Sequence, residues 1–395
     1  MRGRDSGMIA AWAVFLAAGF VLYVLFGYPL LLVWLGRRKR SVCREFQART
    51  VSVVMPVRNG EAWIEAKLKT LAAQRYPAEL VEVLVISDGS TDRTAELVRQ
   101  WPGGRVRLLE VPQGGKALAL NAGLAEATGE ILFFTDVRQR LGANALAELI
   151  ANFHDPEVGV VSGELVILEG ESQEEASVGA YWRYEKWIRC QLSGIDSVLG
   201  ATGAIYAMRR GLARPLPAGT LLDDVYLPLA AFFAGYRVTF EPLALAYDEP
   251  TSLAGEFRRK VRTLAGNYQL LASYPQLLHP GRNRMWIHYL SHKFGRLLLP
   301  WALITVALAS FFLPDSGRWP WGRWLLVGQA AFYGLAALDF VLPDKSRAKK
   351  LSSPVRTFVV LMAASAGAIS YFFVPAESLW TTVAAGKGPG KAKAR

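Results

Sequence analysis

The sequence predicts an α/β domain with a mostly parallel sheet, inserted between one N-terminal and about three C-terminal transmembrane helices. Two observations lead to this prediction. Between about residues 50 and 250, short runs of β-branched and aromatic residues alternate with segments of helical periodicity, which is typical of βαβ units. Long apolar runs bracket this region, one at residues 8–35 and the others within residues 297–374.

The elements of the central region follow each other closely along the chain. Each predicted strand is a buried apolar run, and each predicted helix carries apolar residues at helical spacing. The predicted strands are 51–56, 81–86, 106–111 and 131–134, and the helices between them are 61–73, 91–100 and 116–127.

The composition favours a membrane-anchored chain. Of its 395 residues, 52% are hydrophobic, and they cluster in the apolar runs. The formal net charge is +12, but the basic residues flank those runs, where they would face anionic lipid headgroups. Because no recognition helix, aromatic RNP strand or zinc spacing accompanies this charge, we expect no nucleic acid partner.

The first apolar run, residues 8–35, is long enough to span a bilayer, and Pro29 is expected to kink or end it. It is too long for a cleavable signal peptide, and no small-residue cleavage site follows. The basic cluster RRKR at residues 37–40 comes next, so the positive-inside rule puts the central region in the cytosol. The basic loop at residues 344–350 agrees with this orientation.

The C-terminal part divides into three segments. Residues 251–296 are basic and amphipathic, so they are expected to lie at the headgroup level, as is the aromatic stretch 181–188, for which packing within the domain is an equal alternative. Residues 297–374 hold three apolar segments, at about 297–313, 324–342 and 355–374, and residues 375–395 form a basic flexible tail.

Two aspartates follow predicted strands directly. Asp88 comes at the end of the second strand and Asp136 just after the fourth. Ligands of open α/β sheets bind at the carboxyl ends of the strands. The two carboxylates therefore mark a candidate ligand site.

The motifs around these aspartates resemble inverting family 2 glycosyltransferases of the GT-A (Rossmann-like) fold. The segments that carry the resemblance are VSVVMPVRNGE at 51–61, SDGSTD at 87–92 and GKALALN at 115–121. The layout of apolar segments is similar to that of the cellulose, hyaluronan and poly-N-acetylglucosamine synthase branch. The resemblance covers about residues 50–265.

The resemblance implies a nucleotide-sugar site. Asp88 would accept a hydrogen bond from a uracil ring, while Pro56 and Glu61 would line the base pocket and Lys116 would reach the nucleotide. The residues themselves leave plainer roles open. Asp88 lies in good turn chemistry, and Lys116 sits at a helix start where a solvated lysine is ordinary.

Asp136 corresponds to the first acid of the DxD motif of this family. That motif holds a divalent cation, Mg²⁺ or Mn²⁺, on the donor diphosphate. Here Arg138 replaces the second acid. Arg138 cannot bind a metal, but it could neutralise the diphosphate directly. Metal dependence is therefore in doubt, although Asp136 with diphosphate oxygens could still hold an ion.

The resemblance places the general base in the Asp223–Asp224 pair. Asp224 would take the proton of the acceptor hydroxyl, with Asp223 as its neighbour, because adjacent acids can split their pKa values. A pair that caps a helix is the alternative. Thr202 and Gly203 belong to a small-residue strip that would approach the sugar and the acceptor.

The polymerising synthases carry a Gln-x-x-Arg-Trp motif after the base. Here the corresponding positions are Arg259, Arg262 and Thr263, so the arginine is kept and the tryptophan is lost. Arg259 and Arg262 would bind the diphosphate. The loss of the tryptophan weakens the case for a processive polymerase.

We therefore expect a membrane-bound inverting glycosyltransferase that transfers a hexosyl or N-acetylhexosaminyl group from a nucleotide sugar, with UDP as the expected nucleotide. The acceptor would be lipid-linked or a growing glycan, at the cytosolic face of a bacterial inner (cytoplasmic) membrane, in polysaccharide or cell-envelope synthesis. Its partners would include the lipid bilayer and an export or assembly protein. A processive polysaccharide synthase and a non-catalytic nucleotide-sugar-binding subunit are the alternatives.

Overall fold

The computed structural model describes residues 2–37, 39–168, 173–249, 253–313, 321–343 and 346–379. The chain forms two compact units. The helical unit comprises Met1–Arg37, Glu169–Ile188 and Pro250–Pro375. The sheet unit comprises Arg38–Leu168, Arg189–Glu249 and Ala376–Arg395.

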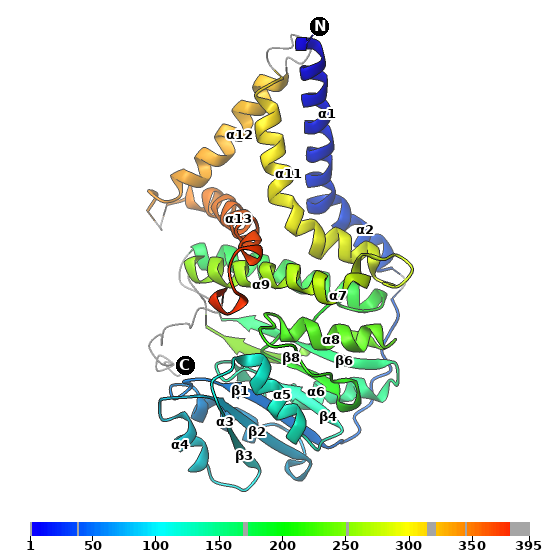
Figure 1. The fold of residues 1–395 in the computed structure, drawn as a ribbon, viewed down its shortest axis with the longest axis vertical. Coiled ribbons are helices and arrows are strands. Elements are labelled where there is room, and N and C mark those ends of the chain that lie inside the picture. Colours follow the sequence, from blue (N-terminus) through cyan, green and yellow to red (C-terminus); the bar gives the residue numbers. More distant parts are fainter. Residues whose placement is uncertain are drawn as a thin grey trace. The chain divides into compact units, whose positions relative to one another are not determined.

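The sheet unit is built on one mixed sheet with the strand order β3-β2-β1-β4-β7-β6-β8-β5 (Figure 1). Strands β3, β2, β1 and β4 run parallel to one another. Parallel strands need a crossover connection, which helices provide here. Strand β7 pairs antiparallel with both β4 and β6, and β8 is parallel to β6. The strands are β1 Val51–Val57, β2 Val81–Asp88, β3 Val106–Val111, β4 Ile131–Phe134, β5 Arg140–Leu141, β6 Val158–Ile167, β7 Tyr206–Arg209 and β8 Arg237–Asp248.

The predicted elements of the first half are confirmed, with small shifts at their ends. The four predicted strands are β1 to β4, and the three predicted helices are α3 Ile64–Ala72, α4 Thr94–Arg99 and α5 Lys116–Glu126. The second half adds α6 Ala145–Ala151, α8 Asp223–Phe233 and strands β5 to β8, none of which was predicted.

Buried apolar side chains of β1, β2 and β4 pack against the helices that connect them. Val53, Val85 and Phe133 are fully buried, and Ile64 and Leu68 of α3 lie in the same hydrophobic cluster. Strands buried on both faces are continuous apolar runs instead of alternating ones. This is why their positions could be read directly from the sequence.

The helical unit contains long helices and two π-helical turns, at Tyr23–Gly27 and Tyr289–Phe294. Helix α1 packs along α11, and α12 packs on α13 (Figure 1). Pro29 does not end the first helix, which continues as α2 after the first π-helical turn. The helices are α1 Arg2–Leu22, α2 Tyr28–Leu35, α7 Gln173–Ile195 (up to Ile188 in this unit), α9 Leu253–Ser273, α10 Trp286–His288, α11 Gly295–Ser310, α12 Trp321–Leu338 and α13 Lys349–Gly367.

Three helices of the described residues are long and apolar enough to cross a membrane, at Gly7–Leu35, Trp286–Ser310 and Lys349–Phe372. The sequence predicted four spans. The predicted span at 324–342 forms α12, but this helix has 18 residues and contains Arg323 and Gln329, which lower its mean hydropathy. It is not among the three.

The second candidate span begins earlier than predicted. Residues 282–285 are not helical, and the helix that starts at Trp286 continues through a π-helical turn into α11. The predicted interfacial stretch 181–188 is helical, as part of α7. Arg38, residues 344–345 of the basic loop and residues 380–395 of the tail lie outside the described residues.

Gly129 allows a close approach between the start of β4 and β1. A Cβ atom at this position would lie 2.6 Å from the backbone nitrogen of Ser52. We expect Gly129→Ala to lower the free energy of unfolding by about 1–3 kcal/mol, because the strands would have to move apart. Thermal unfolding should show a lower Tm.

Gly104→Ala is the matched control, since a Cβ atom there meets nothing within 4 Å. An unchanged Tm for Gly129→Ala would contradict the close packing at this edge of the sheet.

Candidate active site

The site begins at the carboxyl end of β2. The carboxylate of Asp88 accepts hydrogen bonds from the backbone nitrogens of Gly114 at 2.7 Å and Gly115 at 3.1 Å. Gly115 has a φ of 85°, a conformation that glycine adopts easily and other residues rarely. Asp88 therefore fixes the loop from which α5 starts.

Lys116 is the first residue of α5 and connects two other elements. Its Nζ lies 3.0 Å from Oδ1 of Asp136 and 3.2 Å from Oδ2 of Asp223. Asp136 follows β4, and Asp223 starts α8. The side chain of Asp223 is 6% exposed and that of Asp136 is 38% exposed, so the pair of contacts runs from the interior to the surface of the site.

The carboxylates keep Lys116 charged. Burial lowers the pKa of its ammonium group, but the negative charges of Asp136, Asp223 and Asp224 outweigh burial and raise this pKa above its usual value. Lys116 is therefore a fixed positive charge at the carboxyl edge of the sheet.

Asp224 is held by the small-residue strip. Its Oδ2 accepts a hydrogen bond from the backbone nitrogen of Gly203 at 3.0 Å, and its carbonyl oxygen accepts one from Ala201 at 2.7 Å. Both aspartates lie in the first turn of α8, where the helix dipole stabilises negative charge. A Cβ atom at Gly203 would lie 3.1 Å from the same oxygen, so a glycine permits this approach.

Thr202 is part of a separate polar contact. Its backbone nitrogen donates to Oγ of Ser162 at 3.0 Å, and Arg189 donates to its Oγ1. Thr202 thus anchors the strip to β6, while Gly203 contacts Asp224.

Tyr206 was not predicted, and it lies directly beside these groups. It pairs with Phe134 across β4 and β7, and the two rings stack with their centroids 4.5 Å apart. Burial, together with the charges of Asp223, Asp224 and Asp136, raises the pKa of its phenol well above the usual value. The raised pKa keeps the hydroxyl protonated, and this hydroxyl has no hydrogen-bond partner among the described residues.

Lys67 of α3 supports the loop that carries Asp136. Its Nζ donates to Oγ1 of Thr135 at 2.6 Å and to the carbonyl oxygen of Gln139 at 2.7 Å. Burial lowers its pKa to about 7, although the charge of Asp136 opposes this. A lysine on the apolar face of the predicted helix 61–73, between Ile64 and Leu68, was the sequence signal for this contact.

Arg138 forms an ion pair within the sheet unit. Its Nη2 lies 2.6 Å from Oδ2 of Asp248, the last residue of β8, and Gln139 donates to the same oxygen at 2.9 Å. The side chain of Asp248 is 3% exposed. Arg138, which stands in place of the second acid of the DxD motif, is therefore a cation held by a buried acid.

Pro56 and Glu61 lie at the carboxyl end of β1 and in the loop that follows. Pro56 pairs in register with Ile86 of β2. Glu61 is exposed and accepts a hydrogen bond from the backbone nitrogen of Arg93 at 3.2 Å. Both residues thus lie on strands or loops beside Asp88.

Arg259 and Arg262 lie on α9, in the helical unit. Arg259 pairs with the buried Glu256 at 2.6 Å, and its guanidinium lies 4.9 Å from the ring centroid of Trp182 in α7. Lys260 lies 5.1 Å from the same ring. These contacts pack α9 on α7 within the helical unit.

The geometry of the sheet unit agrees with the comparison of the chain to protein families. Residues 52–216 match the model described as "Glycosyl transferase family 2". The chain carries a family 2 glycosyltransferase domain. Asp88, Lys116, Asp136 and Gly203 lie within the matched residues, while Asp223 and Asp224 follow them.

Two curated relatives agree with this assignment. The chain is 25% identical over 260 residues to the protein named "Probable glycosyltransferase YdaM" of Bacillus subtilis (strain 168), which covers 60% of this chain and 59% of the relative. It is 26% identical over 234 residues to the poly-beta-1,6-N-acetyl-D-glucosamine synthase of Staphylococcus aureus (strain COL). That match covers 56% of this chain and 55% of the synthase.

A solved structure shares the fold over most of the chain. The mannosyltransferase PcManGT from Pyrobaculum calidifontis, in complex with GDP-Man and Mn²⁺, matches with a TM-score of 0.70 and 25% identity. The match covers 91% of this chain and 99% of that one. The predicted GT-A fold of the glycosyltransferase domain is confirmed.

Lys116→Met would leave the carboxylates of the site without their ammonium group. We expect this variant to bind Mn²⁺ at least about tenfold more tightly than the wild type in the absence of nucleotide, because hard oxygen ligands attract a divalent cation once the internal cation is removed. Isothermal titration with Mn²⁺ measures this difference.

Lys69→Met, which removes an exposed lysine of α3, is the control and should bind Mn²⁺ as the wild type does. Equal affinities of Lys116→Met and the wild type would show that Lys116 does not occupy the position of a cation.

Proposed function

We propose that this chain is a membrane-bound inverting glycosyltransferase that moves a hexosyl or N-acetylhexosaminyl group from a nucleotide sugar to an acceptor hydroxyl. The contact that carries the proposal is the one between Lys116, Asp136 and Asp223, because it puts a fixed cation and acids at the ligand-binding edge of the sheet.

Asp224 is the general base of the proposed reaction. Its carboxylate takes the proton of the acceptor hydroxyl while that oxygen attacks the anomeric carbon of the sugar. The bond between this carbon and the diphosphate oxygen breaks, the electron pair leaves with the nucleoside diphosphate, and the configuration inverts. The hydrogen bond from Gly203 orients the carboxylate for this step.

Lys116 stabilises the leaving diphosphate. Its raised pKa keeps it positively charged as negative charge develops on the leaving oxygen, and a positioned cation is worth more inside a partly buried site than in water. Asp136 and Asp223 hold the ammonium group in place before the donor binds.

The donor is expected to be a UDP-sugar, with Asp88, Pro56 and Glu61 near the base. Asp88 fixes the loop 114–115 in the absence of donor, and its oxygens retain capacity to accept a further hydrogen bond. The neighbouring mannosyltransferase was solved with GDP-Man, so guanosine donors belong in any test.

The described residues do not fit a preformed metal site. No group of three or more His, Cys, Asp or Glu side chains among them could hold an ion, and Arg138, paired with Asp248, takes the second position of the DxD-like motif. In the proposed reaction the ammonium group of Lys116 therefore supplies the positive charge, whereas Mn²⁺ accompanies GDP-Man in the mannosyltransferase structure.

The membrane placement rests on the candidate spans and on charge. Arg37, Lys39 and Arg40 follow the first candidate span, which favours a cytosolic position for the glycosyltransferase domain at the inner membrane. The proposed acceptor is a lipid-linked or growing glycan at that face. Processive synthesis is a second candidate, favoured by the likeness to the poly-beta-1,6-N-acetyl-D-glucosamine synthase and opposed by Thr263 in place of the tryptophan.

Nucleoside-diphosphate release from a panel of UDP- and GDP-sugars tests the proposal, with the protein in lipid nanodiscs and crude lipid acceptors present. We expect one donor to be turned over. Asp224→Asn should lower the rate at least about a hundredfold and leave donor binding in place, because it removes the base and not the cation.

Glu110→Gln, which changes an exposed acid of β3, is the control and should retain full activity. Donor binding without release by the wild type would instead favour a non-catalytic subunit. Release that Asp224→Asn leaves intact would refute the assigned base.

Chelation by EDTA tests whether an internal cation carries the diphosphate. We expect the wild type to retain donor turnover within about tenfold of its full rate, because Lys116 supplies positive charge without an added metal. Lys116→Met should lose the turnover that resists EDTA. Complete loss of wild-type release under EDTA, restored by Mn²⁺, would show that a metal is required.

A further inference from the structure

An apolar cavity lies among three helices of the helical unit. It has a volume of about 190 Å³ and is bounded by Pro300 and Leu303 of α11, Tyr333 of α12, and Met362, Ala363 and Ala366 of α13. Helices α11 and α13 belong to candidate membrane spans. A cavity lined in this way offers almost no hydrogen-bonding groups, so water has little to bind there.

The basic helix α9 lies against the end of α13 that carries the cavity. Gly367 follows Ala366, and a Cβ atom there would lie 3.7 Å from Val261 of α9. Tyr268, two turns further along α9, contacts the ring of Phe372 with centroids 5.2 Å apart. The wall of the cavity that α13 forms therefore meets α9.

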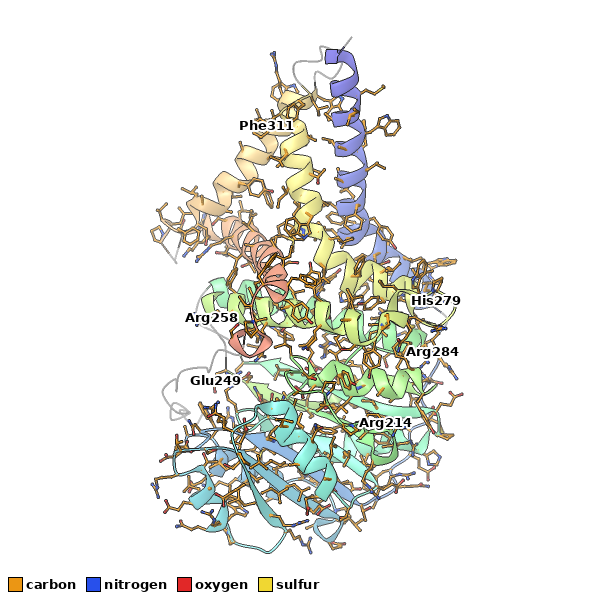
Figure 2. The ribbon with its side chains drawn as sticks, viewed as in Figure 1. Arg214, Glu249, Arg258, His279, Arg284 and Phe311 are labelled. Atoms are coloured by element: carbon orange, nitrogen blue, oxygen red, sulfur yellow. The ribbon has the colours of Figure 1, made fainter. Side chains whose placement is uncertain are left out.

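Arg258 is an exposed cation on this side of α9. It precedes Val261 by three residues, so the two side chains lie on the same face of the helix. Figure 2 shows Arg258 on α9, on the side where α13 ends, and Phe311 at the opposite end of α11. A positive charge thus lies on the face of α9 that meets α13 next to Ala366, a residue of the cavity wall.

We propose that this cavity binds the hydrocarbon chain of a lipid-linked glycan, with the phosphate that joins the glycan to this chain contacting Arg258, and that a hydroxyl of this glycan is the acceptor of the glycosyltransferase. The last part rests on the proposed function. The hydrocarbon chain of the lipid occupies the space between α11, α12 and α13. The guanidinium group of Arg258 provides paired hydrogen-bond donors that match phosphate oxygens.

Size and chemistry favour a single hydrocarbon chain. The cavity is somewhat larger than the roughly 150 Å³ apolar cavity that takes up benzene, so it fits a segment of one chain. A soluble glycan would leave its hydroxyls without partners against this lining, which makes a sugar a poor occupant. A charge beside an apolar cavity matches a molecule with one tail and one anionic head.

The test uses dodecyl phosphate with a diazirine near the end of its chain, and the full-length protein in phosphatidylcholine nanodiscs without nucleotide sugar. After irradiation, labelled peptides are mapped by mass spectrometry. We expect labelling on α11 and α13 around the cavity, with competition by unlabelled dodecyl phosphate and at least about tenfold weaker competition by dodecanol or inorganic phosphate.

Two variants separate the cavity from the cation. Ala366→Phe fills the cavity and should abolish the labelling, while Ala331→Phe, at an exposed position of α12 outside the lining, should leave it unchanged. Arg258→Gln should remove the preference for dodecyl phosphate over dodecanol. Arg282→Gln, at an exposed arginine before α10, should keep that preference.

Labelling that Ala366→Phe does not reduce, or equal competition by dodecanol in the wild type, would overturn the proposal, and the wild-type competition remains decisive if a variant fails to fold. Because the label is read without donor, lipid binding is measured even if no sugar is transferred. Loss of transfer with labelling intact would count against the proposed function and not against the lipid site.

Discussion

The ion pairs of Lys116 hold the candidate site together. Three elements that are far apart in the sequence meet at its ammonium group: the start of α5, the loop after β4 and the start of α8. Without a cation at this point, the carboxylates of Asp136, Asp223 and Asp224 would repel each other across a partly buried space. The chain supplies that cation itself. A charge that belongs to the fold is present before any ligand arrives and costs no binding entropy.

The surrounding residues keep this cation in position. Asp88 fixes the glycine loop from which Lys116 projects, and Lys67 holds the loop that carries Asp136 from the interior of α3. Arg138 is occupied by Asp248, a buried acid at the end of β8. An arginine in place of the second acid of the DxD motif thus requires an acid elsewhere, since a partly buried guanidinium group needs a negatively charged partner. Asp248 supplies the partner that the arginine at position 138 requires.

The parallel half of the sheet could be predicted because its strands are buried on both faces and its loops are short. Asp88 and Asp136 were placed correctly at strand ends for this reason alone. The ion pair of Arg138 could not be predicted, since Asp248 lies more than one hundred positions away along the chain, on a strand paired through β6 and β7. The position of Tyr206 depends on the same antiparallel strands. Lys67 had a local signal, a charge on an apolar helix face, whose partners come from other elements.

In the helical unit, the apolar pattern predicts where the helices lie in the sequence, but polar residues within a helix influence how it packs on its neighbours. Periodicity predicted its apolar segments, yet α12 carries Arg323 and Gln329 and is less apolar than the two candidate spans that contain α11 and α13. A helix of this kind needs neighbours that accept its polar groups, and Gln329 donates to Ser310 of α11 at 3.1 Å. Such a contact draws one end of α12 to α11, while α13 packs along α12. Pro300 of α11 lines the cavity among these helices, and its ring takes up space beside the helix, which limits how closely the neighbouring helices can pack against it.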